Sequence, residues 1–481
     1  MKKIKYMLKS NRVTRPVYMI LYYLYWYGVE AALRKVKEKM TKRSKPAGLS
    51  YVQNISADKN DEENHVSGTK LYIEEFVDSI NSYCNRNYLI DKLPDTATIK
   101  NGIILPFSSL PNQKYSFAGG AGGVCYPDGS FAAGHIRNFS QKDNPYDDNS
   151  DTCRAYSVPE EVEDVHETVV YGGLYIDAYG HIITECLSRL WWYVENTNCN
   201  HKCVFISNSQ HFGDKFIEFL DLLGIPKENI ILCKNATRFD NVIIPDQAFY
   251  FIGGYTEKAK MIYNNIRDSV QRGPYEKVYL TKSKFPGNDI INEEYFENFY
   301  RSLGFVVISP ECLTIKEQIS VLAGAKHLVC MLGTLGHQIA FCQDGINLTI
   351  LKKVKYPIFT QYWMNQLRNT YCTFIDVSNN FLPHTPTGAG SLCVPTIHWK
   401  QYLHDNDILL QCDDFDLNSV VVKYIELWAK NVAGFVYIPE LLQFMNKFTL
   451  ANVIIGINEG LSNEKLDENV KKILHRTFSK S

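Results

Sequence analysis

The sequence lacks the patterns that identify several common protein classes. Its 13 cysteines are scattered, odd in number and without a Cys-x-x-Cys pair, which disfavours a zinc ribbon and indicates reduced thiols, not a disulfide framework. It has no Gly-x-x-x-x-Gly-Lys-Ser/Thr loop and no Gly-x-Ser-x-Gly elbow. A P-loop NTPase and a serine hydrolase of the nucleophile-elbow kind are therefore disfavoured.

Net charge is also nearly absent, at −1, but the charge is unevenly distributed. Residues 1–45 hold 13 Lys and Arg and only two acidic residues, so this arm is strongly basic and the remainder is mildly acidic. A basic arm on an acidic body favours an anionic surface as its partner. No recognition-helix, zinc-finger or basic-aromatic RNA signature accompanies the arm, so we expect no nucleic-acid partner.

The arm contains an apolar-aromatic run at 16–28, flanked by basic residues. Its apolar part is about 12 residues, whereas a spanning helix needs about 20, and it has no small-residue cleavage site. Tyr and Trp prefer the headgroup zone, so we expect a membrane-interface helix within 1–45 that binds anionic lipid. The alternative is a helix packed on the protein's own core or on a partner subunit. The polar segment 46–66 is expected to be a linker.

A chain of 481 residues suits two domains. From Tyr275 onward, short apolar runs alternate with segments of helical period, which is typical of parallel βαβ units. The expected strands are 277–281, 305–309, 327–331, 347–351 and 371–377, and the expected helices are 292–304, 314–325 and 359–369.

The same rhythm is looser upstream, with expected strands at 167–173, 202–207, 229–233 and 241–245 and helices at 179–194, 212–224 and 256–271. Gly273-Pro274 is the expected hinge. The glycine cluster 119–123 is followed by a turn instead of a helix. It lacks the context of a dinucleotide-binding loop, and we interpret it as a loop.

The predicted fold class is α/β, with two Rossmann-like doubly wound parallel-sheet domains facing a central cleft. The first domain is expected at 67–273, the second at 274–395, and a helical region at 396–481. A ligand would bind at the carboxyl ends of the strands. This arrangement suits a glycosyltransferase, a nucleotide-sugar epimerase or a binding protein, because fold alone does not fix function.

The first candidate site is His181, Glu185 and Arg189, spaced by four so that they share one helical face. A histidine near a helix N-terminus stays neutral, which suits a general base, and Glu185 could fix its tautomer while Arg189 pairs with Glu185. The alternative is a helix cap with an ordinary surface ion pair.

The second candidate site is the turn Gly333–Gly336, followed by His337 and Gln338. Small residues such as Gly333 and Thr334 let backbone N–H groups approach a diphosphate, and His337 could donate to a phosphate oxygen. The alternative is a tight turn with a capping role.

Two further groups are expected to contact the donor. Lys282 and Lys284 follow the strand 277–281, where they could neutralise a leaving diphosphate without a metal, or form a solvated loop. Glu317 and Gln318 begin the helix 314–325, where a carboxylate could bind a ribose diol. No Asp-x-Asp motif lies at a strand end, which disfavours a metal-dependent GT-A enzyme. We therefore expect that no cofactor is required beside the nucleotide-sugar co-substrate, and a divalent metal stays an open alternative.

The segment 179–192, Tyr-Gly-His-Ile-Ile-Thr-Glu-Cys-Leu-Ser-Arg-Leu-Trp-Trp, resembles the Gly-His-x-x-x-Glu-x-x-x-Arg-Leu-Trp signature of glycosyltransferase family 61. The stretch 278–345 is similar to the second domain of that family. Many members carry His-Gly-Ala-Gly-Leu where this chain has 332–336, and an Arg is common where Lys282 stands. The Gly-Thr-Leu form favours the bacterial branch, with its capsule and lipooligosaccharide enzymes.

The resemblance implies an inverting GT-B transferase that uses a nucleotide sugar, with a UDP-sugar expected, and a glycan or lipid-linked glycan acceptor in envelope or capsular polysaccharide synthesis. Carried over, His181 is the base, Glu185 supports it, and Lys282, Gly333, Thr334 and His337 hold the diphosphate. The arm would place the enzyme in the cytoplasm, peripheral on the inner face of the cell membrane. The alternatives are a non-catalytic nucleotide-sugar or glycan binding subunit and an epimerase.

Overall fold

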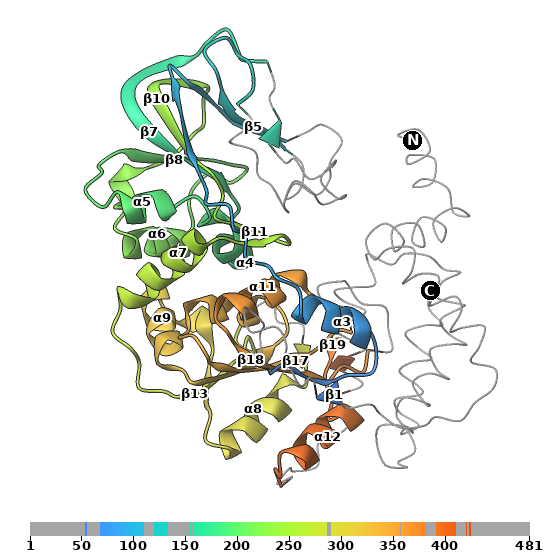
Figure 1. Cartoon of the computed structure of the whole chain (residues 1–481). Helices are drawn as coiled ribbons and strands as arrows, with labels where there is room; N and C mark the ends of the chain where they lie inside the picture. The colour runs from blue at the N-terminus through green and yellow to red at the C-terminus, as the bar shows by residue number, and fades with distance from the viewer. Residues whose placement is uncertain are drawn as a thin grey trace, which may run out of the picture. The chain divides into compact units, whose positions relative to one another are not determined.

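The computed structural model describes residues 53–54, 68–109, 120–132, 153–154, 157–285, 290–355, 357–380, 391–409, 420 and 423–424. The predicted arm 1–45 lies outside the described residues, as do nearly all of the linker 46–66 and most of the helical region 396–481. In the described part, strands and helices form two sheets with helices packed against them (Figure 1).

The first sheet has the strand order β6-β5-β4-β10-β7-β8-β9, with β3 also paired to β10. Its central strand β7 has 13 residues, Glu163–Tyr175, and its apolar second half is buried on both faces, as is typical of parallel sheets. The other strands are β3 (Thr96–Lys100), β4 (Ile103–Ser109), β5 (Gly120–Cys125), β6 (Cys153–Arg154), β8 (Lys202–Ser207), β9 (Ile230–Leu232) and β10 (Thr237–Pro245).

This sheet is only half parallel, so the prediction of a doubly wound parallel sheet is wrong for its other half. Strands β10, β7, β8 and β9 are parallel, whereas β3 and β4 pair antiparallel with β10, and β4 pairs antiparallel with β5. Strands β3 and β4 follow each other along β10 in one direction, with only residues 101–102 between them. Strands β4 and β5 are separated by only residues 110–119, which is too short for the crossover connection that a parallel pair needs.

The glycine cluster 119–123 was interpreted as a loop, and this is wrong for its described residues, which begin strand β5. Gly122 has a φ of +132°, and a Cβ at this position would lie 2.6 Å from the carbonyl oxygen of Pro106 on β4. The glycine therefore permits a close approach of two strands at a bulge between them.

The second sheet has the strand order β1-β2-β18-β17-β16-β13-β15 and is parallel from β2 to β15. It confirms the predicted alternation from residue 277 to 376. Strand β2 precedes the first sheet in sequence yet pairs with β18 in the second. The strands are β1 (Gln53–Asn54), β2 (Lys70–Tyr72), β13 (Lys277–Leu280), β15 (Val306–Ile308), β16 (His327–Met331), β17 (Asn347–Lys352) and β18 (Tyr371–Asp376).

One apolar cluster is continuous between the two sheets. It contains Val170 and Phe205 from the first sheet, Leu328 from the second, and Ile262 from a helix between them. The helices that contribute to it include α3 (Val77–Cys84), α6 (Asp214–Leu222), α7 (Glu257–Asp268), α9 (Ile315–Gly324) and α11 (Phe359–Leu367). The predicted hinge at Gly273-Pro274 is hydrogen-bonded to a helix: the Gly273 N–H donates to the Ser320 carbonyl on α9 at 2.8 Å.

A second cluster covers the other face of the second sheet, where Tyr279 and Val329 pack against Trp399 and Phe296. The helices of that face are α8 (Glu293–Ser302) and α12 (Ile397–Asp405). Two small sheets complete the described strands: β11 (Phe249–Tyr250) with β12 (Gly254–Tyr255), and β14 (Ile290–Ile291) with β19 (Ser391–Leu392). Every helix in the described part is too short or too polar to span a bilayer.

Candidate active site

The segment 179–194 was predicted as one continuous helix, and the structure corrects this. It consists of α4 (Tyr179–His181), a π-type turn η3 (Ile182–Cys186) and α5 (Trp191–Glu195). In the π turn the Leu187 N–H donates to the Ile182 carbonyl at 3.3 Å. The hydroxyl of Tyr263 donates to the neighbouring Ile183 carbonyl at 2.7 Å. Such π turns are common at functional sites, because they change the direction of a few side chains.

His181 and Glu185 are joined by a hydrogen bond between Nδ1 and Oε1. The histidine side chain is 28% exposed, whereas the carboxylate is buried. An ionised carboxylate can only accept, so Nδ1–H donates and Nε2 of the neutral ring carries the acceptor lone pair. The ring also stacks on Phe251, with centroids 5.5 Å apart. The pair therefore has the tautomer and orientation that a general base needs.

Arg189 was predicted to pair with Glu185 or to act on the acceptor side. In the structure its Nη1 donates to the carbonyl of Pro245, at the end of β10. Its guanidinium lies over the Tyr171 ring at 5.8 Å, and a Cβ on Gly173 would come within 3.4 Å of it. Arg189 thus connects two strands of the first sheet, and its role towards an acceptor stays a prediction.

The turn after β16 lies beside the His181 segment. A Cβ on Gly180 would be only 2.9 Å from Oγ1 of Thr334, and the charge of His181 acts on His337. The structure therefore brings together the first two candidate groups, which are 150 residues apart in sequence.

Gly333 occupies a backbone conformation that only glycine adopts readily, with φ +139° and ψ −152°. An added Cβ would have nothing within 4 Å, so open space adjoins this turn. The short helix α10 (Thr334–His337) and a 3₁₀ turn η6 (Gln338–Phe341) follow. A backbone turn with space before it is able to receive a ligand group closely.

His337 and Gln338 are buried, and neither the ring nitrogens nor the amide atoms have a hydrogen-bond partner in the structure. Burial, and then the charge of His181, lowers the pKa of His337 to about 4, so the ring is neutral at physiological pH. Unpartnered buried polar groups cost free energy and are a feature of sites that bind ligands or water.

Glu317 and Gln318 are engaged within the protein. The Glu317 carboxylate accepts from the backbone N–H of Thr314 in a capping box, and this hydrogen bond lowers its pKa. Gln318 donates to the carbonyls of Pro310 and Leu313, and it accepts from the Tyr179 hydroxyl at 3.0 Å. Both residues have structural roles, and contact with a ribose stays a prediction.

Lys282 and Lys284 follow β13, with Lys282 partly exposed and Lys284 exposed. Strand β13 is a direct neighbour of β16, so their carboxyl ends, and hence Lys282 and the Gly333 turn, are at the same edge of the sheet.

Three residues near this edge were missed. Strand β17, on the other side of β16, ends at Lys352, which is followed by Lys353. Glu293, the first residue of α8, is within the electrostatic reach of Lys282 and Lys353. Two consecutive lysines directly after the apolar run 347–351 could have indicated this basic site from the sequence alone. Nothing in the sequence indicated that Glu293 would be buried.

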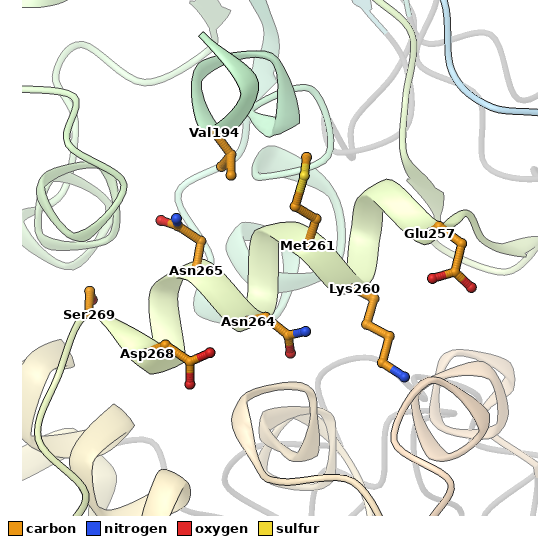
Figure 2. Close-up of a pocket in the computed structure, with 8 residues that line it drawn as sticks. All are labelled: Val194, Glu257, Lys260, Met261, Asn264, Asn265, Asp268 and Ser269. Carbon is orange, nitrogen blue, oxygen red and sulfur yellow. The ribbon is translucent and has the colours of Figure 1, made fainter. Parts of the chain in front are cut away.

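A groove of about 620 Å³ runs along α7 (Figure 2). Val194 lies above the helix in this view, and the remaining lining residues belong to α7 or follow it directly: Glu257, Lys260, Met261, Asn264, Asn265, Asp268 and Ser269. None of the predicted site residues lines this open, polar groove. Among the described residues, no group of three or more His, Cys, Asp or Glu side chains could hold a metal ion.

Comparison with known proteins adds one finding. Residues 179–349 match the family model described as Glycosyltransferase 61, and a search of curated proteins found no match. The matched segment contains the His181–Glu185 pair, the Gly333 turn and both lysines after β13. Residues 179–349 are therefore similar to glycosyltransferase family 61, and this similarity supports glycosyltransferase activity.

Proposed function

We propose that the protein is an inverting GT-B glycosyltransferase that moves a sugar from a UDP-sugar to a glycan or lipid-linked glycan, in the synthesis of a bacterial envelope or capsular polysaccharide. The observation that carries this proposal is the position of the His181–Glu185 pair beside the Gly333 turn. A base and a diphosphate site must lie within one sugar of each other for a single displacement.

In the proposed reaction, Nε2 of His181 accepts the proton of an acceptor hydroxyl as that oxygen attacks the anomeric carbon. The bond between this carbon and the diphosphate oxygen breaks, and UDP leaves with the bonding electrons. Glu185 stabilises the imidazolium that forms, as a buried carboxylate on Nδ1 does in other base–carboxylate pairs.

The diphosphate would lie against the backbone of Gly333 and Thr334, with His337 and Gln338 behind it. Lys282 and Lys284 would balance the charge of the leaving group, so the reaction would need no divalent metal. Because α10 has only four residues, the proposal does not depend on a helix dipole. The basic arm 1–45 would hold the enzyme on the cytoplasmic face of the membrane.

A radiolabelled-donor assay with a matched pair of histidine variants tests this function. Wild-type protein should transfer or slowly hydrolyse a UDP-sugar, and His181→Ala should lower that rate by about 10²–10⁴-fold while UDP binding persists. The control His166→Ala replaces an exposed histidine of β7 and should retain the rate. An unchanged rate in His181→Ala would remove the base assignment.

The same assay separates the enzyme from a non-catalytic binding subunit. A subunit that only binds would retain the UDP-sugar without turnover in wild type and variants alike. An epimerase would convert the free UDP-sugar with no acceptor present.

A further inference from the structure

Glu293 is a buried carboxylate without a hydrogen-bond partner. It is 2% exposed, and neither carboxylate oxygen accepts a hydrogen bond. The nearby hydroxyl of Thr281 donates instead to Glu297 Oε1 at 2.6 Å, and Arg301 donates to Glu297 Oε2 at 2.9 Å. Glu297 is thus fully engaged, and Glu293 interacts with nearby charged groups and with the Thr281 hydroxyl, which lowers its pKa.

The charged groups that face Glu293 come from three elements. Glu297 lies one turn along α8, Lys282 comes from the loop after β13, and Lys353 from the end of β17. Burial and the Glu297 charge raise the pKa of Glu293 to about 7, against the two lysines, which lower it. Near neutral pH this carboxyl is therefore close to an even balance between its two protonation states.

The two lysines flank the proposed diphosphate turn. Strand β16, which leads into Gly333, lies between β13 and β17 in the sheet. Lys282 is partly exposed, so a diphosphate can reach it directly, whereas Lys353 is buried and acts through its charge. A ligand at this turn would therefore change the electrostatic environment of Glu293.

We propose that Glu293 is a positioning residue of the donor site, attracting the Lys282 ammonium through its charge while the site is empty and taking up a proton when a diphosphate draws that ammonium away. The inference rests on the proposed function. The proton comes from solvent and no covalent bond changes. A neutral Glu293 then adds no repulsion to the bound diphosphate, so donor binding and protonation favour each other.

Calorimetric titration of the full chain with UDP-glucose and UDP-N-acetylglucosamine tests this, because neither probe has a group that titrates near neutral pH. Runs in buffers of different ionisation enthalpy give the number of protons exchanged. Wild type should take up a fraction of a proton near pH 7. Glu293→Gln, which keeps the shape of the neutral acid, should take up none from this source, and the control Glu294→Gln on the exposed side of α8 should behave as wild type.

The pH dependence of affinity gives a second readout. The wild-type Kd should rise several-fold from pH 6 to pH 8, up to about tenfold per pH unit above the pKa of Glu293, while the Kd of Glu293→Gln stays flat. Lys353→Gln should move the wild-type transition to higher pH, because it removes a charge that favours the ionised acid. A purely structural role for Glu293 would produce neither change.

Failure of this inference can be distinguished from failure of the proposed function. If wild type binds a probe but exchanges no protons, or if Glu293→Gln exchanges as many as wild type, the role of Glu293 is overturned and the proposed function stands. If folded wild type binds neither probe, the proposed UDP-sugar donor is overturned, and this inference with it.

Discussion

Two buried residues of the site, Glu293 and His337, have pKa values displaced towards their neutral forms. Burial is the main cause in both, and it raises the pKa of the carboxyl and lowers that of the imidazole. Because one group is an acid and the other a base, they change the free energy of unfolding in opposite pH ranges. Single substitutions can separate the two effects.

Glu293→Gln should stabilise the protein at alkaline pH. The folded pKa lies above the unfolded value, so wild type loses stability as pH rises from about 4.5 to about 7, and the loss is complete above that range. A displacement of this size corresponds to roughly 3 kcal/mol. Urea unfolding at pH 5 and pH 8 measures it, with Glu294→Gln as the control. A gain that is equal at both pH values would contradict the ionisation of Glu293 in the folded state.

His337→Asn should make the protein less sensitive to acid. The folded pKa is depressed to about 4, so wild type loses stability as pH falls from about 6.5 to 4, where the unfolded chain takes up the proton first. The loss is roughly 3 kcal/mol at pH 4 and absent at pH 8. The unfolding midpoints of His337→Asn and wild type should approach each other as the pH falls. The midpoint of the control His166→Asn, at an exposed position, should differ from that of wild type by the same amount at every pH.

Among the structural elements, the turn after β16 is the most demanding in backbone conformation. Gly333→Ala meets no steric contact but must adopt a conformation that costs an L-residue about 1–3 kcal/mol. We expect the turn to relax to another conformation, with at least tenfold weaker UDP binding and the overall fold retained.

Gly345→Ala is the matched control for that turn. Gly345 also has a positive φ, +77°, with nothing within 4 Å of an added Cβ. It precedes β17, however, and so lies at the amino ends of the parallel strands, whereas Gly333 lies at their carboxyl ends. It should lower stability by about 1 kcal/mol and leave UDP binding unchanged. The UDP binding of both variants is measured by thermal shift. Equal losses of UDP binding in the two variants would argue against a local role for Gly333.

Strands β13, β15, β16, β17 and β18 of the second sheet were predictable because each is an apolar run within a regular alternation of strands and helices, whereas β1 and β2 were not predicted. Two further elements show why local patterns can fail. The π turn at 182–186 depends on partners such as Tyr263, 80 residues away, and β5 depends on the approach of Pro106. In the site, spacing predicted the His181–Glu185 contact. The positions of Lys353 and Glu293 follow from strand order, which a single sequence does not reveal.

At the scale of the molecule, Arg368 connects parts that are distant in sequence. Its guanidinium is fully buried and donates to the Ala340 carbonyl, to Asn264 on α7 at 2.6 Å and to Asp344 at 3.2 Å. Together with the apolar cluster shared by both sheets, this predicts that the described part unfolds in one cooperative transition.

Arg368→Met should lower the free energy of unfolding by about 3 kcal/mol, because several buried acceptors lose a charged donor. The control Lys326→Met removes an exposed ion pair with Glu276 and should cost less than about 1 kcal/mol. Chemical denaturation followed by both tryptophan fluorescence and circular dichroism measures the two variants. Separate transitions for the two probes would show that the sheets are not coupled.

Strand β2 has a consequence for how the chain acquires its structure. It is made before any strand of the first sheet, yet its partner β18 begins some 300 residues later, at Tyr371. During synthesis β2 can pair with β1, but the edge that pairs with β18 must wait without its partner until nearly all of the described chain has emerged. A fragment starting after β2 would leave β18 as an open edge, able to recruit a strand from another molecule. Fragments for expression should therefore begin upstream of Lys70.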